Sequence, residues 1–177
     1  AHTTVTVSEY NRRHLQREFG AAADRVTRLY NSVDLQAFPF ATKGETAGPD
    51  RIAAVGRLVE KKGFGDLLTA VAELVGAGRE VHVDLVGTGP LEAELHEQIT
   101  ELGLADIVTM HGALTQREVT AMIDDHTALV APFVPGSDGN VDGLPTVLLE
   151  GMAAGIPCVA GSVTAGDVVM VSALTFR

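Results

Sequence analysis

The stretch Ile52-Ala-Ala-Val55-Gly56-Arg57 decides the fold, because it opens a regular alternation of apolar strands and amphipathic helices. Its apolar run is typical of a buried strand, and the spacing of apolar residues after it predicts a helix. The pattern then repeats, with strands predicted at 52–55, 81–86, 107–110, 128–131 and 157–160 and helices at 64–75, 91–102, 119–123 and 145–154. Strands that alternate with helices imply right-handed crossovers. We therefore predict an α/β fold with a doubly wound parallel sheet over 51–177.

The segment before this alternation is less regular. It predicts a strand at 5–7, a helix capped by Ser8 and a strand at 26–30. Residues 39–50 are polar, contain glycine and proline, and are typical of a linker. We therefore divide the chain into an N-terminal piece at 1–38, a linker at 39–50 and the α/β domain.

Composition limits the classes of partner. Acidic residues outnumber basic ones 23 to 13, and the net charge of −10 disfavours nucleic acid or an anionic membrane as the main partner. No apolar run reaches membrane-spanning length and the N-terminus has no signal-peptide pattern, so we expect a cytoplasmic protein. The single cysteine, Cys158, excludes an internal disulfide and is expected in a buried strand.

Small and polar residues follow four of the predicted strands. They are Gly56-Arg57, Gly87-Thr88-Gly89, His111-Gly112 and the loop from Pro132 to Asp142. Open parallel sheets bind ligands at the carboxyl ends of their strands. The sequence therefore predicts one binding site, at that edge.

The first of these loops carries cations in an acidic chain. Arg57 can hold phosphate oxygens with two parallel hydrogen bonds, and Lys62 can add a point charge five residues later. The alternative is a solvated charged turn. Lys61, between them, is expected to be exposed.

The second loop, Val86-Gly-Thr-Gly-Pro-Leu91, has Glu92 where a dinucleotide-binding fingerprint needs its third glycine, which disfavours a dehydrogenase. It could bring the backbone close to a ligand, or it could be only a tight strand-to-helix turn. No Walker-type phosphate-binding motif is present.

The last loop leads into a helix through Asp142-Gly-Leu-Pro-Thr-Val-Leu-Leu-Glu150. Pro145 has no N–H, so Thr146 and Val147 are the better backbone donors for a phosphate at the helix start. Glu150 falls among apolar residues and needs a partner, which the diol of a ribose would supply. The alternative for residues 135–143 is a disordered loop tip.

The six histidines show no metal-ligand spacing, so we predict no metal site. His111 stands apart because it lies at a strand end in the predicted pocket. Together with Gly112 to Thr115 it is expected to border a nucleotide base.

The Asp142–Glu150 stretch closely resembles the E-x7-E signature of the group 1 (family 4) retaining glycosyltransferases, which have two Rossmann-like domains in the GT-B fold. Gly56-Arg57-Leu58…Lys62-Gly63 resembles that family's G-R-L-x-x-x-K-G element, and Val86–Pro90 its V-G-x-G-P turn. The resemblance implies that Arg57 and Lys62 hold the donor diphosphate, that Asp142 faces the donor sugar and that Glu150 binds the ribose. It implies catalytic roles for Arg57, Lys62 and Asp142. The donor-binding residues that it implies are Gly56, Arg57, Lys62, Gly87, Gly89, His111, Gly112, Leu114, Asp142, Gly143, Leu144, Thr146, Val147 and Glu150.

The resemblance extends over nearly the whole chain. Residues 30–38 resemble the family's N-G-V-D-x-x-x-F crossover, with Ser32 in place of glycine, whereas 161–177 departs from the family pattern. Family members carry an acceptor-binding domain before this crossover, which implies that the chain is the donor-binding half of a larger enzyme and is inactive alone.

The expected function is transfer of a sugar, with retention, from a nucleoside-diphosphate donor to an unknown lipid or saccharide acceptor. No cofactor is expected. For the intact enzyme, a peripheral position at the inner face of the membrane stays open. Two alternatives also stay open: a nucleotide-sugar-binding module without turnover, and an enzyme of the sugar-nucleotide epimerase type.

Overall fold

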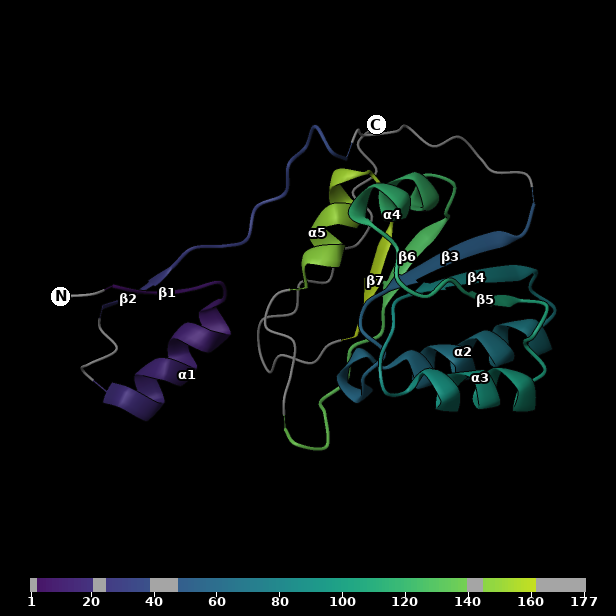
Figure 1. The fold of residues 1–177 in the computed structure, drawn as a ribbon, viewed down its shortest axis with the longest axis horizontal. Helices are drawn as coiled ribbons and strands as arrows, with labels where there is room; N and C mark the ends of the chain where they lie inside the picture. The colour runs from purple at the N-terminus through teal and green to yellow at the C-terminus, as the bar shows by residue number, and fades with distance from the viewer. Residues whose placement is uncertain (1–2, 21–24, 39–47, 140–144, 162–177) are drawn as a thin grey trace.

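The computed structural model describes residues 3–20, 25–38, 48–139 and 145–161. Its main body is a five-stranded parallel sheet with the order β5-β4-β3-β6-β7 (Figure 1). The strands are β3 (Asp50–Val55), β4 (Val81–Val86), β5 (Val108–Met110), β6 (Ala128–Ala131) and β7 (Cys158–Ala160). This confirms the predicted doubly wound parallel sheet.

The helices cover both faces of the sheet. Helices α2 (Phe64–Gly76) and α3 (Glu92–Glu101) lie on one face, and α4 (Gln116–Ile123) and α5 (Thr146–Ala153) lie on the other (Figure 1). Because successive strand residues point to opposite faces, Ala54 joins the core beneath α2 and α3, whereas Ala53 joins the core beneath α4 and α5. Both faces of the central strand are therefore buried.

The strand order places the candidate site. From β3 the chain winds outward through β4 to β5, then returns across the sheet to β6 on the other side of β3. The direction of winding reverses between β3 and β6, and the connections after these two strands lead to opposite faces of the sheet, to α2 and to α5. Such a switch point is where open α/β sheets bind ligands.

The N-terminal unit is a separate two-stranded parallel sheet with one helix. It consists of β1 (Thr4–Thr6), α1 (Glu9–Phe19) and β2 (Val26–Arg28). The predicted Ser8 cap is confirmed, since its hydroxyl accepts a hydrogen bond from the Asn11 N–H at 3.1 Å. Strand β1 lies one residue before its predicted range of 5–7, and β2 ends two residues before the end of its predicted range of 26–30.

Strand β3 begins two residues earlier than predicted. The Asp50 N–H donates to the Glu80 carbonyl at 2.9 Å, and the Asp50 carboxylate pairs with Arg79 at 2.7 Å. These polar partners extend the strand into residues whose composition is typical of a linker. Residues 39–47 of that linker lie outside the described residues.

The prediction for Cys158 is confirmed. It is buried in β7, and burial raises the pKa of its thiol to about 11, which makes a reactive thiolate unfavourable. Within the described part of the chain, no helix combines the length and the apolar character needed to cross a lipid bilayer.

Candidate functional site

Backbone hydrogen bonds join the loops that follow β3, β4 and β5. The Gly56 N–H donates to the Val86 carbonyl at 2.9 Å, and the Gly87 N–H donates to the Gly112 carbonyl at 2.8 Å. The Leu58 N–H donates to the Thr88 carbonyl at 3.0 Å. Three of the four predicted loops therefore form one continuous surface at the carboxyl edge of the sheet.

Two glycines make this packing possible. Gly87 has φ 141°, and a Cβ there would lie 1.8 Å from the Gly56 carbonyl oxygen. A Cβ at Gly89 would lie 2.4 Å from the Leu58 carbonyl oxygen. The close backbone approach in this turn is thus made to the chain's own β3 loop, as the tight-turn alternative expects. Contact of Gly87 and Gly89 with a ligand stays a prediction.

The β3 loop also contacts the loop after β6, across the switch point. It contains a short 3-10 helix, η2 (Glu60–Lys62), whose Lys61 carbonyl accepts from the Val134 N–H at 3.1 Å. The Ser137 hydroxyl donates to the Glu60 carboxylate at 2.6 Å, and this hydrogen bond lowers the pKa of Glu60. The two loops on either side of the crevice are therefore tied together.

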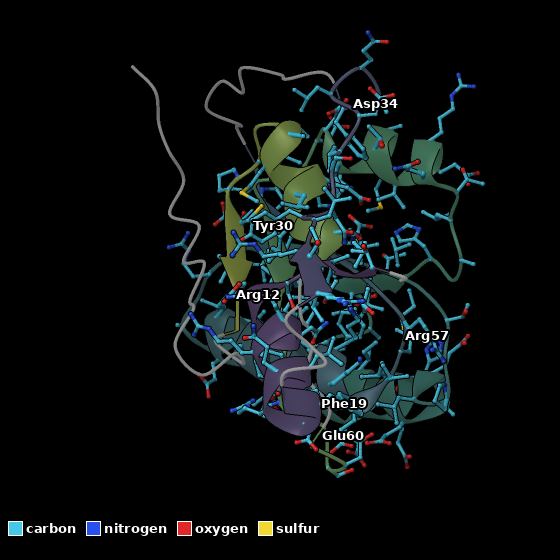
Figure 2. All side chains as sticks on the ribbon, turned by 90° about the vertical axis from the view of Figure 1, so that its left-hand side faces the viewer. Arg12, Phe19, Tyr30, Asp34, Arg57 and Glu60 are labelled. Carbon is cyan, nitrogen blue, oxygen red and sulfur yellow. The ribbon has the colours of Figure 1, made fainter. Side chains whose placement is uncertain are left out.

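A cavity of about 360 Å³ lies between these two loops. Its lining residues are Arg57, Val59, Glu60, Lys61, Gly136, Ser137 and Asp138. Arg57 and Glu60 are exposed, and their side chains are labelled in Figure 2. Lys61 is half-buried and lines the cavity beside Arg57, so the expectation that it is exposed is wrong. This volume is in the range of small-ligand sites.

Lys62 points elsewhere. Its ammonium nitrogen lies 4.8 Å from the centroid of the Phe133 ring, a cation–π contact. Its side-chain carbons lie 3.4 Å from the position that a Cβ on Gly56 would take. Lys62 is half-buried between the loops of β3 and β6, an arrangement that a solvated charged turn does not predict.

Helix α5 places Glu150 one turn beyond its start. Pro145 is the N-cap residue, Thr146 is exposed and Val147 is half-buried. Glu150 is also half-buried, and burial raises the pKa of its carboxyl group. Among the described residues, none forms a side-chain hydrogen bond with this carboxylate. A hydroxyl-bearing ligand would donate a hydrogen bond to this carboxylate.

The residues after β5 differ in where they point. Gly112 has φ 67°, and no atom lies within 4 Å of where its Cβ would be, so one side of it is open. The side chain of His111 turns toward Asp84, whose Oδ1 lies 2.6 Å from His111 Nε2. Leu114 packs against the core beneath α4 and α5. A base at this position would therefore meet the Gly112 backbone more readily than these two side chains.

The structure thus brings Gly56, Arg57, Lys62, Gly87, Gly89 and Gly112 together at one edge. Asp142, Gly143 and Leu144 lie outside the described residues. Sequence reasoning missed Lys61 and Ser137 as cavity residues. Nothing in the sequence signals the contact of Ser137 with Glu60, because the two are 77 positions apart. The described residues contain no group of His, Cys, Asp and Glu arranged to hold a metal ion.

Residues 49–175 match the family described as "Glycosyl transferases group 1". The chain is 30% identical over 141 residues to the amylovoran biosynthesis glycosyltransferase AmsK of Erwinia amylovora, covering 80% of this chain and 35% of that protein. It is 31% identical over 169 residues to the GDP-mannose-dependent alpha-(1-6)-phosphatidylinositol monomannoside mannosyltransferase of Mycobacterium tuberculosis, covering 88% of this chain and 43% of that protein.

A solved structure supports the fold. The Anabaena protein Alr3699/HepE, in complex with UDP and glucose, superimposes with a TM-score of 0.74 at 21% identity, covering 92% of this chain and 45% of that one. The chain therefore spans less than half the length of each of these three proteins.

Proposed function

The chain belongs to the group 1 glycosyltransferase family, and we propose that its carboxyl-edge site binds the nucleoside-diphosphate sugar used as donor by the intact enzyme. The observation that carries the proposal is the cavity between the loops of β3 and β6, where Arg57 and Lys61 lie together. Glu60 and Asp138 also line the cavity, so its formal charges balance, and the Glu60 carboxylate accepts from the Ser137 hydroxyl. What favours a phosphate there is the Arg57 guanidinium beside Lys61, because a guanidinium can hold phosphate oxygens with paired hydrogen bonds.

The proposed reaction is transfer of a hexosyl group with retention of its anomeric configuration. Arg57 and Lys62 stabilise the negative charge that builds on the departing diphosphate, the role that fixed cations serve in such sites. Asp142 faces the donor sugar and Glu150 holds the ribose diol. No metal or cofactor takes part, because the cations supply the positive charge that a metal would otherwise bring.

The names of similar proteins suggest which sugar nucleotides to consider as the donor. One relative is named as GDP-mannose-dependent, and one solved structure holds UDP with glucose. We propose a UDP- or GDP-hexose as donor and a lipid or saccharide as acceptor. A further domain of the intact, cytoplasmic enzyme binds the acceptor, so this chain alone binds the donor without transferring the sugar.

The proposal is tested with a panel of UDP-, GDP- and ADP-sugars. Calorimetry on this chain measures binding, and product analysis on the intact enzyme measures sugar transfer and donor hydrolysis. Transfer by the intact enzyme supports the proposal. Binding without transfer or hydrolysis identifies a non-catalytic module, and conversion of the donor sugar into its epimer identifies an epimerase.

Binding of UDP or GDP is expected to survive metal removal. Arg57 and Lys61 line the cavity, and Lys62 lies in the same loop against Phe133; we propose that these three cations take the place of a metal ion. Calorimetric titrations with EDTA and with added Mg²⁺ or Mn²⁺ should give the same affinity within experimental error. Affinity that appears only with a divalent ion would contradict the proposed site.

Replacing Glu150 with glutamine is expected to weaken nucleotides with a complete ribose diol. The loss of a charged hydrogen bond costs about 1.5–3 kcal/mol, and the binding free energy of 2′-deoxy analogues should fall much less.

The same substitution is also expected to change the stability of the chain. Because burial raises the pKa of Glu150, its ionised form is unfavourable in the fold. The resulting loss of stability is present at neutral pH and is relieved as pH falls through the raised pKa of the folded state to the ordinary pKa of the unfolded chain. Glu150→Gln should therefore make the ligand-free chain more stable at neutral pH.

The matched control is Glu97→Gln, an exposed acid in α3 that should leave both affinity and stability unchanged. Equal losses for ribose and 2′-deoxyribose ligands would show that Glu150 serves the fold and not the ligand.

A further inference from the structure

Asp84, in β4, is a buried acid that the proposed reaction does not use. Its carboxylate is 4% exposed and meets groups from four segments of the chain. Arg51 Nη2 of β3 lies 2.9 Å from Oδ2, and His126 Nε2, after α4, lies 2.8 Å from the same oxygen. His111 Nε2, after β5, lies 2.6 Å from Oδ1, and His82 Nε2 lies 3.6 Å from it.

These contacts keep the acid ionised. Burial alone would raise the pKa of Asp84, but hydrogen bonds from His111, Arg51 and His126 together hold it well below its ordinary value. An ionised carboxylate only accepts hydrogen bonds. His111 must therefore carry its proton on Nε2 whenever its ring is neutral.

His126 anchors the other side of the carboxylate. Its Nδ1 lies 2.8 Å from the Met122 carbonyl oxygen, and its Nε2 faces Asp84. Both partners are acceptors, so the complete arrangement needs a proton on each ring nitrogen of His126. Burial lowers the pKa of His126, and the two hydrogen bonds offset this effect only in part, so the net shift is downward. A neutral His126 ring therefore donates to only one of the two acceptors at a time. Arg51 and His126 thereby fix Asp84 against β3 and the end of α4.

The His111 side of the cluster leads to the candidate site. The His111 N–H donates to the Leu85 carbonyl at 2.9 Å, and the next residue, Gly112, accepts from the Gly87 N–H at 2.8 Å. Gly87 packs directly against the Gly56 carbonyl. A displacement of His111 would therefore reach the β4 and β3 loops through two backbone contacts. Gly112 has open space beside it, at the same edge.

We infer that Asp84 is a positioning residue for the donor site, holding His111 so that Gly112 and the β4 loop keep the arrangement that receives the nucleoside. This role rests on the proposed function. It differs from the role of a purely structural buried charge, because it acts through His111 and changes the affinity for the nucleoside.

Asp84→Asn tests the role. The carboxamide keeps the size of the acid, but its NH₂ group replaces one of the two accepting oxygens. It therefore sets a donor either against Arg51 and His126, which contact Oδ2, or against His111, which contacts Oδ1. Among UDP, GDP and ADP, the nucleotide that binds the wild-type chain most tightly is used as the probe, together with its nucleoside. Both should bind Asp84→Asn about tenfold more weakly. Asp106→Asn, at an exposed acid just before β5, should bind them as the wild type does.

Coupling to His111 separates positioning from a general loss of stability. His111→Ala should weaken the nucleoside by a similar factor. In the double variant, Asp84→Asn should cause little further loss of nucleoside affinity, because His111, through which Asp84 acts, is already absent. Additive losses would overturn the role of His111 as the link, as would a wild-type affinity in the folded Asp84→Asn variant. Failure of the wild-type chain to bind any of the three nucleotides would overturn the proposed function and this role with it.

The contact between Asp84 and His111 can also be tested on the wild-type chain, without any variant. Long-range ¹H–¹⁵N NMR correlations report the tautomer of each histidine ring. The neutral His111 ring should carry its proton on Nε2, and this assignment does not depend on nucleotide binding. A proton on Nδ1 would show that Asp84 does not hold His111, and would overturn the inference even if the nucleotide binds.

Discussion

Replacing Arg57 with alanine is expected to weaken UDP or GDP binding about 10- to 100-fold, as follows from losing charged hydrogen bonds worth about 1.5–3 kcal/mol. Binding of the nucleoside should hardly change, because the nucleoside has no phosphates. Arg57→Lys should restore only part of the affinity, since a point charge cannot reproduce the paired hydrogen bonds of a guanidinium. Isothermal titration with nucleoside and nucleoside diphosphate measures both effects.

The neighbouring lysines extend this test. Lys62→Ala should also weaken the diphosphate selectively, and Lys61→Ala should do so because Lys61 lines the cavity with Arg57. Salt should weaken diphosphate binding less in each variant than in the wild type. In the intact enzyme, kcat should fall as well as kcat/KM, because charge on the leaving diphosphate is greatest in the transition state.

Arg79→Ala is the matched control for these cations. Arg79 is exposed and pairs with Asp50 at the start of β3, at the opposite end of the sheet from the loops of the site. The Arg79→Ala variant should bind UDP and GDP with the affinity of the wild type. If Arg57→Ala and Lys62→Ala also bind the diphosphate normally, neither residue holds the diphosphate.

Replacing Gly87 with alanine is expected to lower the free energy of unfolding by about 2–6 kcal/mol, because strained backbone and overpacking each cost about 1–3 kcal/mol. The residue has φ 141°, and its new Cβ would lie 1.8 Å from the Gly56 carbonyl oxygen. The three nearest atoms all belong to the backbone of Gly56 and Arg57, so no flexible side chain can move away to make room. Urea denaturation monitored by circular dichroism gives the value directly.

Gly76→Ala is the control for this substitution. Gly76 ends α2, and no atom lies within 4 Å of the position that a Cβ would take there, so alanine should stabilise the chain by about 0.5–1 kcal/mol. A Gly87→Ala variant as stable as the wild type would show that the β3 and β4 loops are not packed together as described.

Much of the fold could be predicted, because each strand and helix has its own periodic signal. The ranges of β4 and β6 agree with the predicted ones. Strand β4 is mostly apolar and lies between Glu80 and Gly87, and β6 is an apolar run between Thr127 and Pro132. A parallel sheet then places the ends of its strands at one edge, so the loops of Gly56, Gly87 and Gly112 could be grouped from the sequence alone.

Contacts between distant residues could not be predicted in this way. The 3-10 turn of η2 sends Lys61 toward the cavity and Lys62 toward Phe133, and a charged tripeptide does not reveal which lysine goes where. The strand pattern places His111 correctly at the carboxyl edge, yet its hydrogen bond to Asp84 joins residues 27 positions apart. Such pairs depend on tertiary packing, about which local periodicity carries no information.

The most direct test of the central claim is to map the nucleotide on the chain. Backbone amide chemical shifts are recorded while the tightest-binding of UDP, GDP and ADP is added. The account predicts changes concentrated at Gly56–Lys62, Gly87–Gly89, Gly112–Thr115 and Thr146–Glu150, with α1 and α3 unaffected. Shifts concentrated away from these four segments, or no shifts with any of the three nucleotides, would contradict a donor site at the carboxyl edge of this sheet.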